Sequence, residues 1–107
     1  MNKGFCIVIT TFSSEKEAEA VIEKVIREKL AACVQSMPIT STYYWDGDVQ
    51  KDNEVLVLFK TKESLYCEIK RTILEEHKYE TPELVRVNID DGYEDYLSWI
   101  NEVTRHE

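Results

Sequence analysis

One dipeptide, Asp46-Gly47, constrains the fold of this chain more than any other feature, because it separates two strand-like runs. An Asp-Gly pair in such a position predicts a tight hairpin turn, since the turn needs residues that tolerate positive φ. The two arms lie within residues 31–61. About a dozen residues per arm, at ~3.3 Å per residue, gives roughly 40 Å. A hairpin of that length exceeds what a small domain needs for its own core, so we expect another copy of the chain to cover its far end.

Hydrophobic patterning places two further strands and three helices around the hairpin. Residues 4–12 predict a strand that is apolar on both faces, and residues 84–89 predict one with alternating faces. Capping sequences and apolar stripes predict helices over residues 15–30 and about 64–76, and a last helix opened by Asp91. The order is therefore β-α-β-β-α-β-α. Its first six elements are the split βαβ arrangement of a ferredoxin-like α+β fold.

Three local expectations follow from single residues and stripes. Pro38 cannot donate to a sheet ladder, so it should lie at an edge, bulge or bend, and we expect the long strand to kink near Met37-Pro38. The tail from Thr104 should fray. The last helix should bury one stripe, made of Tyr93, Tyr96, Leu97, Ile100 and Val103.

The second arm of the hairpin predicts a sheet that is apolar on both faces. Val55, Val57 and Phe59 share one face, and Leu56, Leu58 and Lys60 share the other. Two helices on one side leave the second face, with the hairpin aromatics Tyr43, Tyr44 and Trp45, without a cover. Packing three sheets face to face would bury it, so we expect a homotrimer.

Composition limits the class of protein. The chain has 107 residues, so we expect one domain over residues 1–107, and 43% of them are apolar, which suffices for a core. The formal net charge is −8, which disfavours nucleic acid and anionic membranes as partners. No apolar run is long enough to span a membrane or to serve as a signal-peptide core, and three cysteines without a close motif do not describe a disulfide framework. We therefore expect a cytoplasmic protein.

Motifs for catalysis are missing from the sequence. Three scattered glycines form no phosphate-binding loop, and no serine or cysteine lies in a nucleophile motif. The two histidines, one of them in the tail, offer little material for acid–base chemistry. We expect a protein that is not an enzyme.

Several short motifs, in order along nearly the whole chain, give it a specific family resemblance. The chain resembles the CutA family, which is named for divalent-cation tolerance. The matching residues are Thr10-Thr11, the run Lys29 to Val34, Tyr44 to Gly47, Lys60-Thr61, the run His77 to Glu83, and Tyr96 to Trp99.

The resemblance implies a trimer of ferredoxin-like subunits that is associated with tolerance of divalent metal ions, with copper as one bound ion. It also implies an architecture shared with the PII signalling trimers, so the alternative is a PII-like trimer that binds a small ligand in a cleft between subunits. The positions that match proposed copper ligands of the family are Thr10, Glu76 and His77, so one soft ligand remains. Lys78 stands where the family usually has proline.

Five residues are candidates for a cleft between subunits: Trp45, Lys60, His77, Tyr79 and Glu83. His77 is also the candidate metal ligand, for a divalent ion such as copper or zinc. Each candidate has a plainer interpretation as well. His77 is equally suited to end a helix as a cation, Lys60 to form an interface ion pair with Glu83, and the aromatic residues to anchor an interface.

Overall fold

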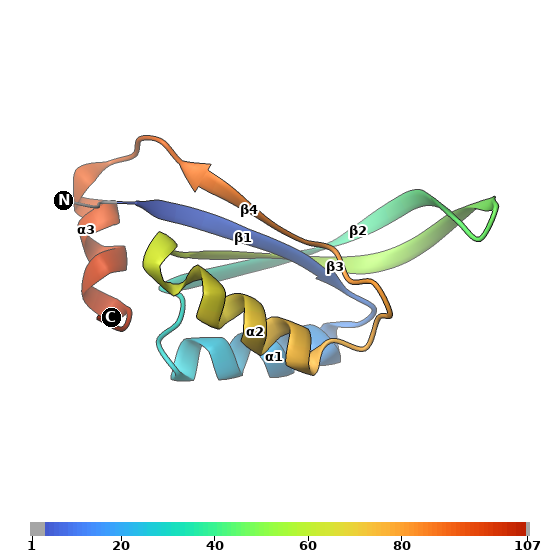
Figure 1. The fold of residues 1–107 in the computed structure, drawn as a ribbon, viewed down its shortest axis with the longest axis horizontal. Coiled ribbons are helices and arrows are strands. Elements are labelled where there is room, and N and C mark those ends of the chain that lie inside the picture. Colours follow the sequence, from blue (N-terminus) through green and yellow to red (C-terminus); the bar gives the residue numbers. More distant parts are fainter. Residues whose placement is uncertain (1–3, 107) are drawn as a thin grey trace.

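The hairpin extends beyond the rest of the molecule in a computed structural model that describes residues 4–106 (Figure 1). Its arms are β2 (Cys33–Trp45) and β3 (Asp48–Lys62), paired without a bulge from Cys33 opposite Lys60 to Trp45 opposite Asp48. Asp46 and Gly47 have φ of 55° and 79°, which confirms the predicted turn with positive φ at both central residues. The longest dimension of the molecule is 47 Å, and the hairpin accounts for this elongation.

The sheet has four antiparallel strands in the order β2-β3-β1-β4, where β1 is Phe5–Phe12 and β4 is Leu84–Ile89. The apolar β1 lies in the interior, between β3 and β4, as its two apolar faces predict. The two edges are β2 and β4. This is the ferredoxin-like α+β arrangement that the order of elements predicts.

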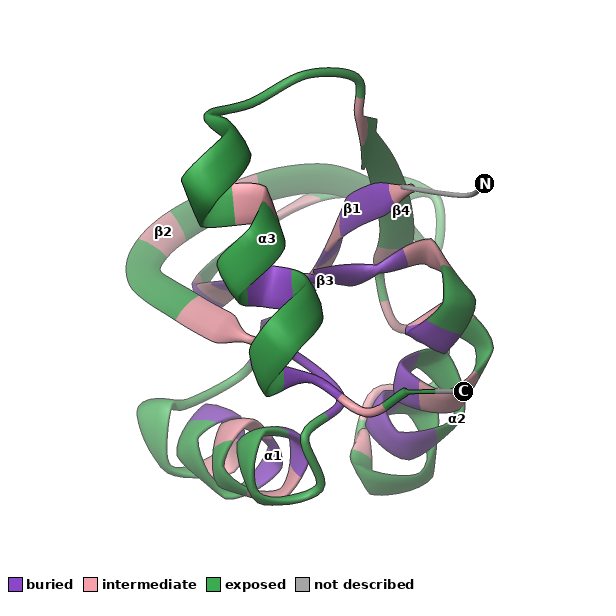
Figure 2. Ribbon diagram, turned by 90° about the vertical axis from the view of Figure 1, so that its left-hand side faces the viewer, coloured by how far each residue is buried: buried purple, intermediate pink, exposed green. Residues whose placement is uncertain are grey.

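Helices α1 (Glu15–Arg27) and α2 (Tyr66–Glu76) cover one face of the sheet, and a short 3-10 turn (Glu63–Leu65) precedes α2 (Figure 1). Both helices turn their buried residues toward the sheet (Figure 2). Ser14 caps α1 by accepting a hydrogen bond from the Glu17 N–H at 3.2 Å, as the capping sequence predicts. The core between the layers is built mainly from alternate residues of β1 and β3 and the inner stripes of the helices: Cys6, Val8, Phe12, Val21, Val25, Leu30, Val57, Phe59, Leu65, Ile69 and Ile73.

Helix α1 ends at a residue whose backbone is left-handed although it is not glycine, and the sequence gives no signal for this. Lys29 has φ of 58°, and the Leu30 N–H donates to the Val25 carbonyl at 3.0 Å while the Lys29 N–H donates to that of Ile26 at 3.0 Å. This is the Schellman pattern, whose left-handed position is usually glycine. The turn directs Leu30 into the core, where it is fully buried.

Replacing Lys29 with glycine should therefore stabilise the protein. The left-handed conformation costs a residue with a Cβ roughly 1–2 kcal/mol, and glycine avoids this cost. Part of the resulting gain in stability is lost, because glycine has more conformational freedom in the unfolded chain. We expect the free energy of unfolding to rise by about 0.5–1 kcal/mol, measured by urea denaturation. Lys29→Ala keeps the Cβ and serves as the control. Equal stability of the two variants would contradict this explanation.

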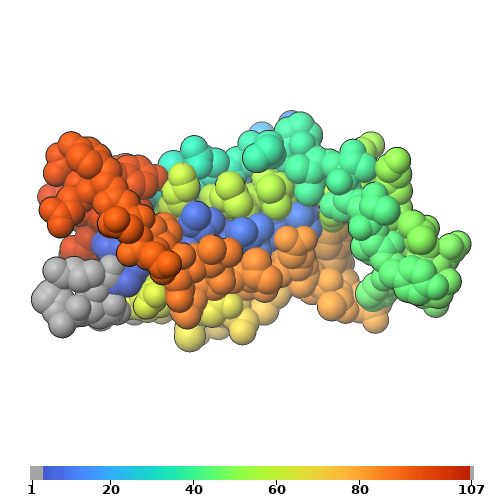
Figure 3. Space-filling view, turned by 90° about the horizontal axis from the view of Figure 1, so that it is seen from above, coloured from blue at the N-terminus to red at the C-terminus, as the bar shows by residue number. Residues whose placement is uncertain are grey.

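The opposite face of the sheet is uncovered between the hairpin and α3, and parts of all four strands are visible on it (Figure 3). The strand register places Leu58 opposite Ile9, and Ile9 opposite Val85. Val85 and Val87, on the edge strand β4, are each 48% exposed. We call this surface the open face, and its apolar members are Ile7, Ile9, Met37, Leu56, Leu58, Val85 and Val87. The predicted division of β3 into two apolar faces is confirmed.

One local expectation is confirmed and another is corrected by the structure. Pro38 lies on an edge strand, as predicted, and the pairing of β2 continues through it, with Pro38 opposite Val55. The expected kink near Met37-Pro38 stays a prediction. Pro38 is tolerated because β2 is an edge strand, where one missing donor does not break the ladder. Helix α3 (Glu94–Val103) buries only Ile100 fully, whereas Tyr93 is 74% exposed. The expected stripe does share a helix side, but most of it has no layer to pack against within one chain.

The predicted fraying of the tail from Thr104 is also wrong for the described residues. Thr104 is buried, and its hydroxyl donates to the Ile100 carbonyl at 2.8 Å. The Arg105 N–H donates to the Lys29 carbonyl at 2.9 Å, and Lys62 Nζ donates to the Arg105 carbonyl at 2.6 Å. These bonds fasten the end of the chain to the end of α1 and to β3.

Candidate functional site

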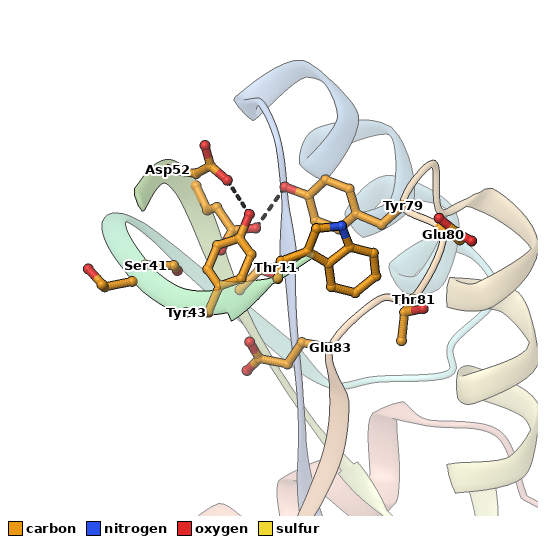
Figure 4. A pocket seen from close by; sticks show the side chains of 11 residues that line it. Thr11, Ser41, Tyr43, Asp52, Tyr79, Glu80, Thr81 and Glu83 are labelled. Atoms are coloured by element: carbon orange, nitrogen blue, oxygen red, sulfur yellow. Dashed lines mark hydrogen bonds between the residues drawn. The ribbon is translucent and has the colours of Figure 1, made fainter. Parts of the chain in front are cut away.

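A pocket of about 490 Å³ lies between the outer half of the hairpin and the segment that joins α2 to β4 (Figure 4). We call it the hairpin pocket. Three aromatic residues line it, together with four carboxylates and four hydroxyl residues: Tyr43, Trp45, Tyr79; Asp52, Glu54, Glu80, Glu83; Thr11, Ser41, Thr42 and Thr81. The register places Ser41 opposite Asp52, on the same side of β3 as Leu56 and Leu58. The pocket therefore continues from the end of the open face.

Two phenols in the pocket are held by carboxylates of β3. The Tyr79 hydroxyl donates to Glu54 Oε2 at 2.7 Å, and the Tyr43 hydroxyl donates to Asp52 Oδ2. The two hydroxyl groups point toward the same region of the pocket (Figure 4). Burial, followed by the hydrogen bond to Glu54, raises the pKa of Tyr79 well above its ordinary value. The hydrogen bond to Asp52 raises the pKa of Tyr43. Both phenols thus stay neutral hydrogen-bond donors.

Tyrosine ionisation provides a direct check of this geometry. Ordinary tyrosines ionise at about pH 10. In that pH range, the absorbance curves of phenol ionisation should coincide for the native chain and for Tyr79→Phe. They should separate only at higher pH, where the last phenol of the native chain loses its proton. Because the pKa of Tyr79 is raised in the folded state, its contribution to stability is complete below the unfolded pKa and is lost as the pH rises above it. If the native chain ionises one phenol more than Tyr79→Phe already at about pH 10, the Tyr79–Glu54 contact is contradicted.

His77 follows the last residue of α2 and lies against the pocket wall. Its ring stacks on Phe12, with centroids 4.6 Å apart, and lies 5.0 Å from the ring of Tyr79. Nε2 is 2.7 Å from the Thr11 carbonyl oxygen, which can only accept, so Nε2 donates. Nδ1 accepts from the Tyr79 N–H at 3.4 Å. His77 therefore fastens the α2–β4 segment to the end of β1, and a metal ion at either nitrogen would displace one of these partners.

The three positions that resemble copper ligands do not come together in one chain. The Thr10 hydroxyl lies 3.3 Å from His77 Nε2 and donates to the Glu83 carbonyl at 2.7 Å. Glu76 instead pairs with Lys24 of α1 at 3.2 Å. Among residues 4–106, no group of three or more His, Cys, Asp or Glu residues is arranged to hold a metal ion. His77 as a metal ligand stays a prediction that depends on groups from outside the chain.

Of the five cleft candidates, Trp45, Tyr79 and Glu83 line the same pocket, and His77 lies behind Tyr79. Lys60 does not line it. It lies opposite Ile7 on β3, and its ammonium is 5.8 Å from the centre of the Tyr96 ring of α3. Within one chain the suggested pairing of Lys60 with Glu83 is therefore replaced by a cation–π contact. A cleft that Lys60 of one subunit shares with the hairpin pocket of another stays a prediction.

Sequence reasoning missed Tyr43 as a pocket residue, and also Asp52 and Glu54, which hold the two phenols. The signal was present in the hairpin turn. Once Asp46-Gly47 fixes the register, Ser41 must lie opposite Asp52, and the alternate residues of both arms share a face. Glu80, on the segment after α2, carried no comparable signal.

Comparisons with known proteins give one consistent result. Residues 6–103 match the family model of the CutA1 divalent ion tolerance protein. The divalent-cation tolerance protein CutA of Pyrococcus horikoshii is 39% identical over 99 residues, which cover 92% of this chain and 97% of that protein. The crystal structure of CutA1 from Oryza sativa is 35% identical, with a TM-score of 0.93 over 97% of this chain and 96% of that one.

A third relative is described by its cellular compartment. The periplasmic divalent cation tolerance protein CutA from Archaeoglobus fulgidus is 30% identical, with a TM-score of 0.90 over 92% of this chain and 97% of that one. Within residues 4–106, no helix combines the length and the apolar character that crossing a membrane requires.

Proposed function

Because the chain belongs to the CutA1 divalent ion tolerance protein family, we propose that it is a single-domain, non-enzymatic homotrimer that acts in tolerance of divalent metal ions. The observation that carries this proposal is the family match over residues 6–103, together with relatives named for divalent-cation tolerance. The net charge of −8 supports a cationic rather than an anionic partner.

The open face supports the trimer. Seven apolar side chains share it: Ile7, Ile9, Met37, Leu56, Leu58, Val85 and Val87. A contiguous apolar surface of this kind marks an interface in soluble proteins. Threefold packing of the sheets would bury it and would bring the hairpin of one subunit against another.

A metal site in this trimer would be assembled from more than one subunit. His77 is the imidazole candidate, with copper or zinc as the ion, and carboxylates of a neighbouring subunit would complete the donor set. This arrangement agrees with the lack of a suitable donor group among residues 4–106 of one chain.

Calorimetric titration of the purified assembly with Cu²⁺ and Zn²⁺, in a buffer without chelators, tests direct metal handling. We expect saturable binding that His77→Gln weakens, because glutamine retains a donor for Thr11 but lacks an imidazole. His106→Gln, in the exposed tail, is the matched control and should leave binding unchanged. Heats that show no saturation, or equal losses in both variants, would count against His77 as a ligand.

The cysteines support a proposal about the location of the protein. Cys6, Cys33 and Cys67 are all free in the structure. Unpaired cysteines suit a reducing compartment, so we propose a cytoplasmic protein. The relative from Archaeoglobus fulgidus is described as periplasmic, so membership of the family does not decide the compartment. Fractionation of cells, followed by detection of the native chain, decides it.

A second candidate function is a PII-like trimer that binds a small ligand between subunits. The hairpin pocket favours ligand binding in general, because it combines three aromatic side chains with polar groups that hydrogen bonds orient. Its four carboxylates disfavour nucleotides and other anions at this position. A thermal-shift screen of the assembly with nucleotides and organic anions tests the candidate, and a flat response leaves it without support.

A further inference from the structure

We propose that the hairpin pocket binds a small organic cation of the methylated-ammonium class. The proposal rests on the chemistry of the lining and does not depend on metal tolerance.

Charge is the first argument. Asp52, Glu54, Glu80 and Glu83 all line the pocket, and among residues 4–106 no lysine, arginine or histidine lines it. Two of these carboxylates accept hydrogen bonds from neutral phenols, which orient them without cancelling their charge. The lining therefore has a strongly negative potential and favours a cation.

The aromatic residues are the second and independent argument. Tyr43, Trp45 and Tyr79 line the same pocket, although Trp45 is 49% exposed and Tyr43 is 41% exposed in the chain. Aromatic faces around a cavity attract quaternary ammonium groups through the ring quadrupole. The hydrogen bonds from Tyr79 to Glu54 and from Tyr43 to Asp52 fix both rings in place, so the pocket is formed before a ligand arrives.

Geometry separates an organic cation from a metal ion. A metal ion needs several donor atoms at one point, and no such group of three or more acidic, histidine or cysteine residues occurs among residues 4–106. The carboxylates are instead distributed around a cavity of about 490 Å³, a size typical of small-molecule pockets. A large cation with diffuse charge and apolar methyl groups matches this lining better than a compact ion does.

Choline and its neutral isostere 3,3-dimethylbutanol provide a matched pair of probes, because they differ in charge and scarcely in shape. With the intact assembly, we expect choline to bind about tenfold or more tightly than the isostere. The N-methyl proton resonances of choline should move upfield on binding, since they lie over ring faces. Weak or equal binding of the two probes, without that shift, would overturn the proposal. The same result would follow if a neighbouring subunit fills the pocket.

Variants locate the site. Trp45→Leu should weaken choline binding by about tenfold, while Trp99→Leu, which removes the tryptophan outside the pocket, should leave it unchanged. Glu54→Gln should weaken binding, and Glu94→Gln, on α3, should not. The molecular mass of each variant is checked first, so that a change in assembly is not mistaken for a change in binding. Equal effects of Trp45→Leu and Trp99→Leu, at unchanged mass, would overturn the assignment.

Discussion

Leu58→Asp is expected to convert the proposed trimer into separate subunits at micromolar concentration. Leu58 lies in the middle of the open face, opposite Ile9 of β1 and Gln35 of β2. In a trimer closed over this face, the variant would bury three carboxylates without partners. Each would cost about 2–5 kcal/mol, and the three costs together would strongly favour dissociation. Sedimentation velocity gives the mass directly.

Ala20→Asp is the matched control, because it also replaces an apolar residue with aspartate, but on the exposed side of α1. This control should keep the mass of the native assembly. Far-UV circular dichroism of both variants separates dissociation from unfolding. If Leu58→Asp keeps the mass of the native assembly, the open face is not the interface, and the proposed trimer must close elsewhere.

Phe59→Ala is expected to lower the free energy of unfolding by about 3–5 kcal/mol. Phe59 is 0% exposed and lies on the helix-facing side of β3, opposite Val8 and Val34. Removing its ring leaves a cavity between the sheet and the two helices, and the surrounding strands can relax only in part. Urea denaturation at one fixed subunit concentration measures the loss, because assembly makes stability concentration-dependent.

Phe59→Leu refills most of the cavity and should cost about 1 kcal/mol. A graded loss from leucine to alanine identifies packing as the cause. Losses of equal size in both variants would instead indicate that the aromatic ring itself is needed. In that case, the position of Phe59 in the core would not explain its contribution.

Much of the fold was predictable because its elements have local signals. Asp46-Gly47 determines the turn and therefore the register of the whole hairpin, and the capping residue Ser14 determines where α1 begins. The end of α1 had no such signal, because Lys29 adopts a left-handed conformation that lysine rarely takes. That conformation is imposed by the burial of Leu30 and by the hydrogen bonds that follow.

Helix α3 shows the limit of pattern reasoning. Its apolar residues do recur on one side, as predicted, but burial depends on which surface they meet. Tyr96 meets Trp99 and Lys60 rather than a second layer of the core. The tail was mispredicted for the same reason, since its anchors, Lys29 and Lys62, are far away in the sequence.

Three of the candidate residues, Trp45, Tyr79 and Glu83, line one pocket within the chain, because they flank the hairpin and the segment after α2. Their predicted meeting in a cleft between subunits stays a prediction. Lys60 was grouped with them because a lone lysine at the end of an apolar strand suggested a carboxylate partner such as Glu83. Lys60 lies away from the pocket, because it follows Leu56 by four residues along β3, and Leu56 pairs with Thr11 at the pocket end.

The edge strand β2 presents thirteen residues without a single charged side chain. Natural sheets usually protect such a border with lysine or a bulge, and here Pro38 is the one residue of the strand that cannot donate to an incoming strand. The edge of β2 is therefore protected from pairing with strands of other molecules only while another part of the assembly covers it. In a closed ring of subunits, each β2 edge is covered by a neighbour and no further subunit can be added. If the angle between neighbouring subunits is disturbed, the ring does not close, and further copies can add to the uncovered edge. Damage at the contacts that set this angle would then produce filaments or precipitate rather than soluble monomers.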